Sequence, residues 1–288
     1  MAEPRTTAAR PKVSRRREVS HTSARSLLMT VLGEYALPRG TPVWTSMLVD
    51  VLGFLGVEEK SARQALARSA AEGWIVSERL GRRVRWSLTP PGRRLLTEAA
   101  ERVYAFGRDR PAWDGRWLIL LISVPEAKRD LRHRLRTRLT WAGFGSPVAG
   151  VWISADPGRQ EEADRILADL GLSTQALSFV AAYGEIGEQE AMVTQSWDLT
   201  DLEERYERFI GRFTDLRPSG GRAVLRAQTE LVHEWRRFPY LDPRLPAELL
   251  PTRWCGAKAA DLFHHKHVDW RPDAQHYWDV LLEADETG

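Results

Sequence analysis

The residues best suited to chemistry lie on a predicted helix over residues 58–72. At 100° per residue, one face of this helix carries long polar side chains beside two alanines: Lys60, Arg63, Gln64, Arg68, Ala67 and Ala71. Arginine can donate two hydrogen bonds to guanine, and glutamine can pair with adenine in the same way. The small side chains of the alanines let the helix backbone approach closely, which suits entry into a major groove. This face predicts a helix that reads bases in double-stranded DNA.

A second group of cations follows directly along the chain. Residues 74–79 and 83–88 read as two strands joined by a tight turn at Leu80-Gly81-Arg82, which predicts a β-hairpin. Its arginines are Arg79, Arg82, Arg83 and Arg85. Arg82 and Arg83 flank the tip, where a wing would meet phosphates or the minor groove. A run of charges is usually only a solvated surface, but a basic helix followed by a basic hairpin favours DNA binding.

The flanking elements complete a winged helix-turn-helix. Ser23 is positioned to cap a helix with an apolar stripe from Leu27 to Tyr35, and Leu37-Pro38-Arg39-Gly40 ends it. Thr45 or Ser46 would cap a short second helix, and Pro90-Pro91 would open one to Phe106. Three helices followed by a hairpin is the order of a winged helix. The candidate DNA-contacting residues are Thr45, Lys60, Ser61, Arg63, Gln64, Arg68, Arg79, Arg82, Arg83 and Arg85.

The rest of the chain divides into a mixed segment and a helical one. Strands are predicted over 117–124, 148–154 and 176–183, with helices over 126–141 and 159–170 between them. This β-α-β-α-β order suggests a ferredoxin-like α/β domain. The pattern then turns helical, with a proline-rich connector over 239–251 and final helices over 257–267 and 272–284. We expect an α+β chain with a basic arm (1–22), a winged helix (23–108), a central domain (109–190) and a helical C-terminal domain (191–288).

Composition narrows the class of protein. The single cysteine, Cys255, excludes an internal disulfide and a thiolate zinc site, and fits a reducing cytoplasm. The longest strongly apolar run, 117–124, is far shorter than the roughly 20 residues that span a bilayer. The basic N-terminus has no apolar segment behind it, so no signal peptide is expected. We therefore expect a cytoplasmic protein without a membrane partner.

No catalytic or metal site is predicted. Within 264–269, His264 and His267 share one helix face, whereas His265 and Asp269 share another, so they cannot all converge on one ion. Cys255, near these histidines, is the single weak candidate for a catalytic nucleophile, and a role in packing is the better interpretation of this cysteine. No GxxxxGK phosphate loop occurs. We expect no enzymatic activity and no cofactor.

Several motifs together resemble the PaaX-type family of repressors of phenylacetic-acid catabolism. They occur in order along nearly the whole chain from Ser23: Val43-Trp44-Thr45, Ser61-Ala62-Arg63-Gln64-Ala65-Leu66-Ala67-Arg68, Glu72-Gly73-Trp74, Gly81-Arg82-Arg83, Trp113-Asp114-Gly115-Arg116-Trp117, Trp141-Ala142-Gly143-Phe144-Gly145, Gly150-Val151-Trp152-Ile153, Trp197-Asp198-Leu199, Arg237-Phe238, Asp242-Pro243-Arg244-Leu245-Pro246, Leu249-Leu250-Pro251 and Trp254. The resemblance implies a homodimeric repressor that an aryl-acyl-CoA, typically phenylacetyl-CoA, releases from operator DNA. It also implies a central domain similar to CRISPR-associated adaptation nucleases.

Two further expectations follow from the resemblance. Those nucleases hold metal with an aspartate near the end of the first strand. Here that strand is followed by Ser123-Val124-Pro125-Glu126, which contains no aspartate. We therefore interpret the domain as a dimerisation or sensing scaffold. A CoA ester needs cations for its phosphates and an aromatic slot for its acyl group. The candidates are Arg116, Arg138, Arg253, Lys258 and His264 for the phosphates, and Trp117, Trp141, Trp152, Trp197 and Trp254 for the acyl group. A metal-dependent nuclease and a sequence-neutral DNA binder remain as alternatives.

Overall fold

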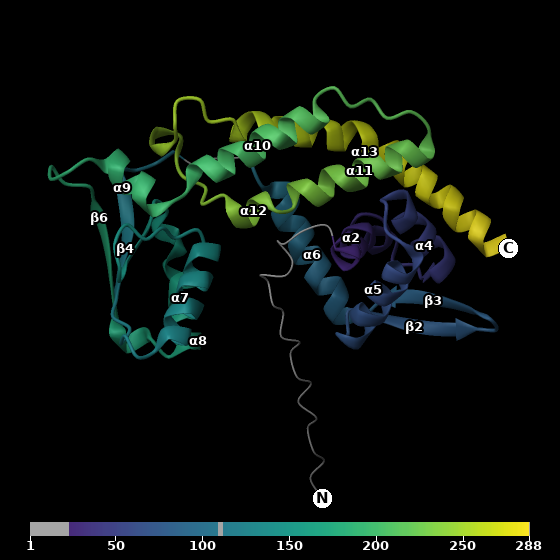
Figure 1. The fold of residues 1–288 in the computed structure, drawn as a ribbon, viewed down its shortest axis with the longest axis horizontal. Coiled ribbons are helices and arrows are strands. Elements are labelled where there is room, and N and C mark those ends of the chain that lie inside the picture. Colours follow the sequence, from purple (N-terminus) through teal and green to yellow (C-terminus); the bar gives the residue numbers. More distant parts are fainter. Residues whose placement is uncertain (1–22, 109–111, 288) are drawn as a thin grey trace, which may run out of the picture. The chain divides into compact units, whose positions relative to one another are not determined.

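The computed structural model describes residues 23–108 and 112–287, and these divide into two compact units. Unit 1 combines the chain up to Tyr104 with Leu216–Trp235 and His264–Gly288. Unit 2 combines Ala105–Asp215 with Arg236–Phe263. The C-terminal segment therefore supplies helices to both units (Figure 1). The basic arm expected over residues 1–22 lies outside the described residues.

Unit 1 begins with the predicted N-terminal helix. Helix α2 (Ala24–Val31) is capped as expected, because the Ser23 hydroxyl accepts a hydrogen bond of 3.2 Å from the Ser26 amide. The helix continues through a π-helical turn, η1 (Leu32–Ala36), into the short α3 (Leu37–Arg39). It ends at Gly40, whose φ of 69° suits a residue without a Cβ atom.

The next two helices have the expected positions, but one expected cap is wrong. Helices α4 (Thr45–Phe54) and α5 (Glu59–Ala71) follow, and Trp44 is the N-cap residue of α4, with no side-chain capping bond. The Thr45 hydroxyl instead donates to the Val84 carbonyl over 2.9 Å and accepts from the Trp86 indole over 2.8 Å. A tertiary contact with the hairpin has replaced the local cap.

The predicted hairpin is confirmed and gains a short third strand. Strands β2 (Ile75–Leu80) and β3 (Arg83–Leu88) pair antiparallel, with Ser77 opposite Trp86. Strand β1 (Val43–Trp44) pairs with the other edge of β3 and leads directly into α4. Helix α6 (Pro90–Ala105) follows, and a Cβ at Gly92 would lie 2.0 Å from the Trp74 carbonyl oxygen, so a glycine is needed there.

Two C-terminal helices complete unit 1. Helix α11 (Gly221–Trp235) packs against α2, and α13 (Gly256–Thr287) ends in this unit. Two separate helices were expected around Pro272, but α13 is continuous through it. Trp270, Ala274 and Trp278 are buried on both sides of the proline, so tertiary packing outweighs the break. The carbonyl that loses its partner belongs to Val268, which is 68% exposed, so water can bind it.

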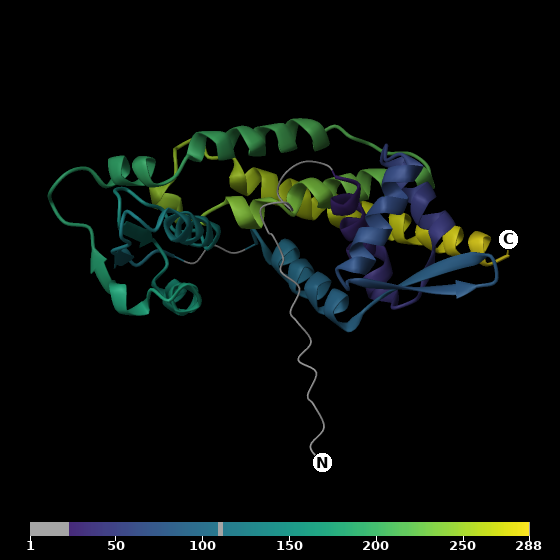
Figure 2. The ribbon, with the colours of Figure 1, turned by 60° about the horizontal axis from the view of Figure 1, so that its bottom comes forward.

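Unit 2 is built on a three-stranded antiparallel sheet of order β5-β4-β6. The strands are β4 (Arg116–Ile122), β5 (Val151–Ser154) and β6 (Ala176–Ala182), in the β-α-β-α-β order expected from the sequence. Leu118, Leu120 and Ile122 point to one face, where α7 (Arg129–Trp141) and α8 (Gln160–Leu170) cover them. Figure 2 shows both helices beside this sheet.

The opposite face of the sheet carries a second, smaller core. Trp117 and Ile153 pack there with Val193 and Leu245. Helix α9 (Gln189–Ser196), the first residue of α10 (Leu199–Phe213) and the segment 245–250, which follows α12 (Phe238–Leu241), contribute to it. Helix α9 was not expected, because its apolar residues Ala191, Met192 and Val193 are consecutive and have no helical spacing. Among the described residues, no helix is long and apolar enough to cross a membrane.

Candidate nucleic-acid interface

Helix α5 has the two faces that the sequence predicts. Ala62, Ala65, Leu66 and Ser69 are buried against the other helices of unit 1. The opposite face is exposed over its whole length: Lys60, Arg63, Gln64, Ala67, Arg68 and Ala71. Ser61 lies between the two faces and is half-buried. The helix therefore presents its long donors to solvent on a rigid, packed support.

The charge on this face is available to a partner. Arg63 pairs with Glu59 one turn away at 2.8 Å, and both side chains are more than half exposed. An exposed pair of this kind contributes at most about 1 kcal/mol. The guanidinium of Arg63 can therefore exchange Glu59 for a base edge or a phosphate at little cost.

The hairpin arginines differ in their surroundings. Arg82 is exposed in the turn between β2 and β3, and Arg79 donates to the Gly81 carbonyl over 3.2 Å. Arg85 lies opposite Glu78 in the sheet and pairs with it at 2.8 Å. Arg83 stacks on Trp44, with 4.1 Å between the guanidinium carbon and the ring centroid. Among the predicted wing residues, Arg82 thus has the position that best suits a phosphate contact.

A buried polar group, here named the Glu34 cluster, joins the N-terminal and C-terminal helices of unit 1. Its members are Glu34, Tyr104, Gln228 and His267. The Glu34 carboxylate, on the π-helical turn, accepts hydrogen bonds from the Tyr104 hydroxyl and from Gln228 Nε2, the latter over 3.0 Å. His267 Nε2 lies 3.4 Å from Glu34 Oε1. Glu34 is only 4% exposed, so these contacts replace its hydration.

The cluster keeps Glu34 ionised. Burial raises the pKa of the Glu34 carboxyl, but His267 and the hydrogen bonds of Tyr104 and Gln228 outweigh burial, and the pKa lies below its usual range. Burial and the Glu34 charge raise the pKa of the Tyr104 hydroxyl, which stays a donor. The sequence pattern did not reveal this cluster, because its members are far apart along the chain.

Further buried contacts attach the same helices to one another. The Tyr35 ring stacks on Trp278 with 4.9 Å between centroids, and its hydroxyl lies 3.1 Å from the Thr229 hydroxyl. Thr30 Oγ1 lies 2.9 Å from His233 Nδ1. Helices α11 and α13 are therefore part of the same packed body as α5 and the hairpin.

The residues expected to bind an acyl-CoA are not all brought together. Trp117 and Trp197 lie on one face of the central sheet with 6.3 Å between ring centroids, whereas Trp152 is buried in the core of the other face. Trp152 pairs with Leu120, which points to the face covered by α7 and α8, whereas Trp117, three residues before Leu120 in β4, points to the opposite face. Trp254 packs edge-on to Tyr206, and His264 belongs to unit 1 beside Trp235.

The remaining candidates are spread over the surface of unit 2. Arg116 pairs with Asp114 at 2.6 Å, and Arg138 pairs with Asp169 at 2.7 Å. Trp141 lies near Tyr240. Arg253 and Lys258 are exposed. The candidates therefore lie at several separate cationic and aromatic positions, and the sequence alone could not show which of them are neighbours.

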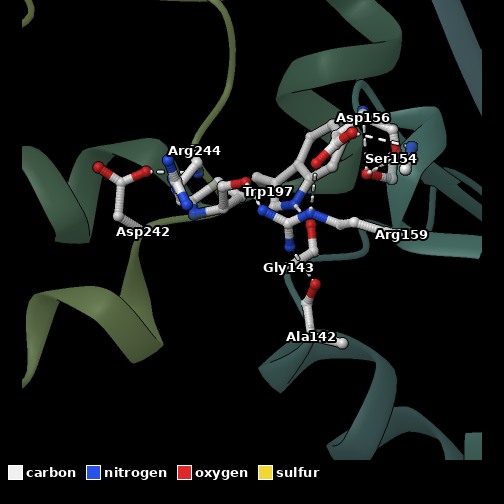
Figure 3. Close-up of polar contacts among 10 residues, drawn as sticks. Ala142, Gly143, Ser154, Asp156, Arg159, Trp197, Asp242 and Arg244 are labelled. Atoms are coloured by element: carbon white, nitrogen blue, oxygen red, sulfur yellow. Dashed lines mark hydrogen bonds and ion pairs between the residues drawn. The ribbon is translucent and has the colours of Figure 1, made fainter. Parts of the chain in front are cut away.

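An arginine whose side chain is only 14% exposed, and which the sequence analysis missed, links several segments of unit 2 (Figure 3). The guanidinium of Arg159, at the start of α8, donates to the Ala142 carbonyl and, over 3.1 Å, to the Pro243 carbonyl. A Cβ at Gly143 would lie 2.0 Å from Arg159 Nη1, and Gly143 also has a φ of 82°, so only glycine fits. Trp197 donates to the Gly143 carbonyl over 3.3 Å. Burial lowers the pKa of Arg159, and these carbonyls compensate for its lost hydration.

The cysteine and histidines considered as nucleophile or metal ligands lie in separate surroundings. Burial, with the nearby Glu203 and Glu207, raises the pKa of the Cys255 thiol, which disfavours the thiolate that a nucleophile needs. Within the described ranges, no group of three or more histidines, cysteines and acids is arranged to hold a metal ion. His264 lies beside Trp235, His265 pairs with Asp269, and His267 faces Glu34.

An exposed face of long polar side chains beside a basic hairpin, on a packed support, is typical of DNA-binding proteins of the regulator class. Three stretches match family models: residues 23–92 match "PaaX-like protein", 110–193 "PaaX protein central Cas2-like domain" and 197–280 "PaaX-like protein C-terminal domain". The chain is 33% identical over 251 residues to the transcriptional repressor PaaX of Escherichia coli K12, covering 83% of this chain and 78% of that protein. The chain therefore belongs to the PaaX family of transcriptional regulators, as its motifs indicate.

A solved structure supports the fold. The uncharacterized protein Rv0674 from Mycobacterium tuberculosis superposes with a TM-score of 0.60, over 91% of this chain and 99% of that one. The two sequences are 23% identical, so the likeness concerns the fold alone.

Proposed function

We propose that this regulator is a repressor that binds operator DNA through a winged helix, with α5 in the major groove and the β2-β3 hairpin as the wing. The exposed polar face of α5, on a helix whose other face is buried, carries this proposal. The central sheet is proposed to be a reduced ferredoxin-like sheet, in which the isolated Gly145–Ile153 bridge stands where a fourth strand would pair. The proposal keeps the three-part division at residues 108 and 190.

Substitutions on α5 test base reading. Arg63→Ala and Gln64→Ala should each weaken binding to the operator by about 5- to 150-fold, which corresponds to roughly 1–3 kcal/mol per bidentate pair. Binding to an unrelated duplex should change much less. Arg226→Ala, on α11, removes the same charge from an exposed arginine, which pairs with the half-buried Glu230, and serves as the control. Equal losses on both duplexes would instead indicate a sequence-neutral DNA binder.

We propose that an aryl-acyl-CoA such as phenylacetyl-CoA releases the repressor from DNA. The family resemblance supports this class of effector, and unit 2 carries exposed cations and several tryptophans that suit it. The effector must favour the low-affinity state by a few kcal/mol to shift the population. Titration of the operator complex with phenylacetyl-CoA, free phenylacetate and CoA should dissociate it with the thioester alone. A complex that persists in the presence of all three compounds would contradict the proposal of an aryl-acyl-CoA effector.

We propose a homodimer with the central domain as its scaffold. Strand β6 supports this, because it is an edge strand without charged residues and exposes Leu177, Phe179 and Val180. Strand β4 ends at Ile122, and no acid follows within three residues, so the proposal gives the domain no nuclease role. Light scattering should give twice the chain mass, and the mass of one chain would contradict the dimer.

A further inference from the structure

The last turn of α13 meets the winged-helix region at the start of α4. The carboxylate of Asp285 accepts hydrogen bonds from the Ser46 hydroxyl over 2.9 and 3.1 Å. Arg83 donates to the same carboxylate over 2.8 Å and also to the Asp285 backbone carbonyl. The side chains of Arg83 and Asp285 are 33% and 19% exposed. This contact joins a residue near the chain's end to two residues more than 200 positions earlier.

The position that Asp285 occupies suits an anion. Ser46 lies in the first turn of α4, whose free amide groups give this helix end a partial positive charge. No side chain caps this end, and none of its first-turn residues is acidic. Arg83 adds a full charge and is held in place by stacking on Trp44. A helix N-terminus, a hydroxyl and an oriented guanidinium together are typical of sites that bind phosphate.

The placement of Asp285 is not explained by its own helix. An acidic residue in the last turn of a helix lies at the negative end of the dipole, where it is disfavoured. The gain must therefore come from Ser46 and Arg83. Upstream contacts hold this part of α13 against the same body: Arg39 pairs with Asp279 at 2.5 Å and donates to the Gln275 carbonyl over 3.0 Å.

The fold places this anion site beside the proposed DNA surface. Strand β1 ends where α4 begins and pairs with β3, which carries Arg83, while α4 packs on α5. In helix-turn-helix docking, the helix before the recognition helix crosses the DNA backbone. A duplex lying along α5 and the hairpin would therefore bring a backbone phosphate to the N-terminal end of α4.

We propose that Ser46, Arg83 and the start of α4 form a binding site for a DNA backbone phosphate, and that the Asp285 carboxylate fills this site in the DNA-free protein. This inference rests on the proposed winged-helix function. Asp285 competes with DNA, so the last turn of α13 has to release Ser46 and Arg83 when the operator binds.

The test is the affinity of Asp285→Asn for the operator and for an unrelated duplex, measured by fluorescence anisotropy over a range of salt. Asp273→Asn is the control, because it removes the same charge from an exposed position of the same helix, 12 residues or roughly 18 Å away. We expect Asp285→Asn to bind both duplexes about 3- to 10-fold more tightly, since a phosphate contact carries no sequence information. The salt slope should become steeper by up to about one unit, because the freed arginine neutralises a phosphate without leaving an acid behind.

A double-mutant cycle makes the test specific. In an Arg83→Ala background, which binds DNA more weakly, Asp285→Asn should lose most of its effect. Unchanged or weaker binding by Asp285→Asn would mean that Asp285 only positions Arg83, and it would overturn the inference while the wild type still binds the operator. Equal gains from Asp273→Asn would reduce the effect to net charge and overturn it as well. Failure of every variant to bind DNA would refute the proposed function itself.

Discussion

Glu34 is a single buried residue that connects several helices of unit 1. Its carboxylate contacts Tyr104, Gln228 and His267, which come from α6, α11 and α13. Position 34 lies beside Tyr35 in a helix whose apolar stripe was predicted, yet its own burial was not. Its partner Gln228 is 194 residues away, and short-range periodicity carries no information about such a contact. Arg159 was missed for the same reason.

The stability of unit 1 should depend on pH through Glu34. The folded state lowers the pKa of this carboxyl, so its contribution to stability is complete above the usual carboxyl pKa of about 4.5 and is lost as the pH falls through the folded-state value. Glu34→Gln should unfold more easily at pH 7, by about 1–3 kcal/mol, because a buried contact is left imperfect. Urea unfolding should give the same difference at pH 7 and pH 5, and the difference should shrink as the pH is lowered from 4.5 towards 3. A difference that stays constant, or equals that of exposed Glu98→Gln, would contradict the role of the charge.

At the scale of elements, local patterns predicted α5, the hairpin and the central β-α-β-α-β order. Helix α5 has its buried residues at helical spacing, the hairpin is two short β-prone runs around a glycine turn, and β4 is a short apolar run. Each of these signals lies within a few neighbouring residues, so the sequence alone reveals it. The continuous α13 could not be predicted, because Pro272 normally ends a helix and tertiary packing on both sides of it, such as that of Trp278 against Tyr35, overrides the break. The cap of α4 failed similarly, since β3 binds the Thr45 hydroxyl.

The wing should contribute phosphate contacts that are independent of sequence. Arg82→Ala removes an exposed cation from the turn between β2 and β3, so affinity should fall by a similar factor on operator and unrelated DNA. The slope of log affinity against log salt should become shallower by about one unit. Arg226→Ala is the matched control, since α11 lies on the side of unit 1 away from the hairpin in both views (Figures 1 and 2). Loss confined to the operator would indicate that Arg82 reads bases instead.

At the scale of the whole molecule, the two compact units are not continuous segments of the chain. The N-terminal helices, α11 and the end of α13 form one unit, although residues 105–215 separate the first two along the chain and residues 236–263 separate the last two. Composition and motifs indicated a regulator with three successive parts. They could not show that the C-terminal segment is shared between two units, because that depends on which buried faces complement each other.

Because C-terminal helices are part of unit 1, we predict that the N-terminal segment is not fully stable without them. A fragment of residues 23–108 would expose the surfaces of Tyr35 and Glu34 that α11 and α13 cover. Its urea midpoint should therefore be clearly lower than that of the corresponding transition in the full chain, and its DNA affinity should fall with it. Full stability and affinity in the fragment would show that the C-terminal helices are dispensable for the winged helix.

The measurement that tests the central claim most directly is the affinity of the full chain for its own promoter region and for a scrambled duplex of equal length, at fixed salt. Sequence-specific binding through α5 predicts a ratio of at least about 1,000 in favour of the promoter site. Both affinities should fall steeply as salt is raised, because each depends on phosphate contacts. Equal affinities for the two duplexes would contradict an operator-binding repressor and leave only a sequence-neutral contact with DNA.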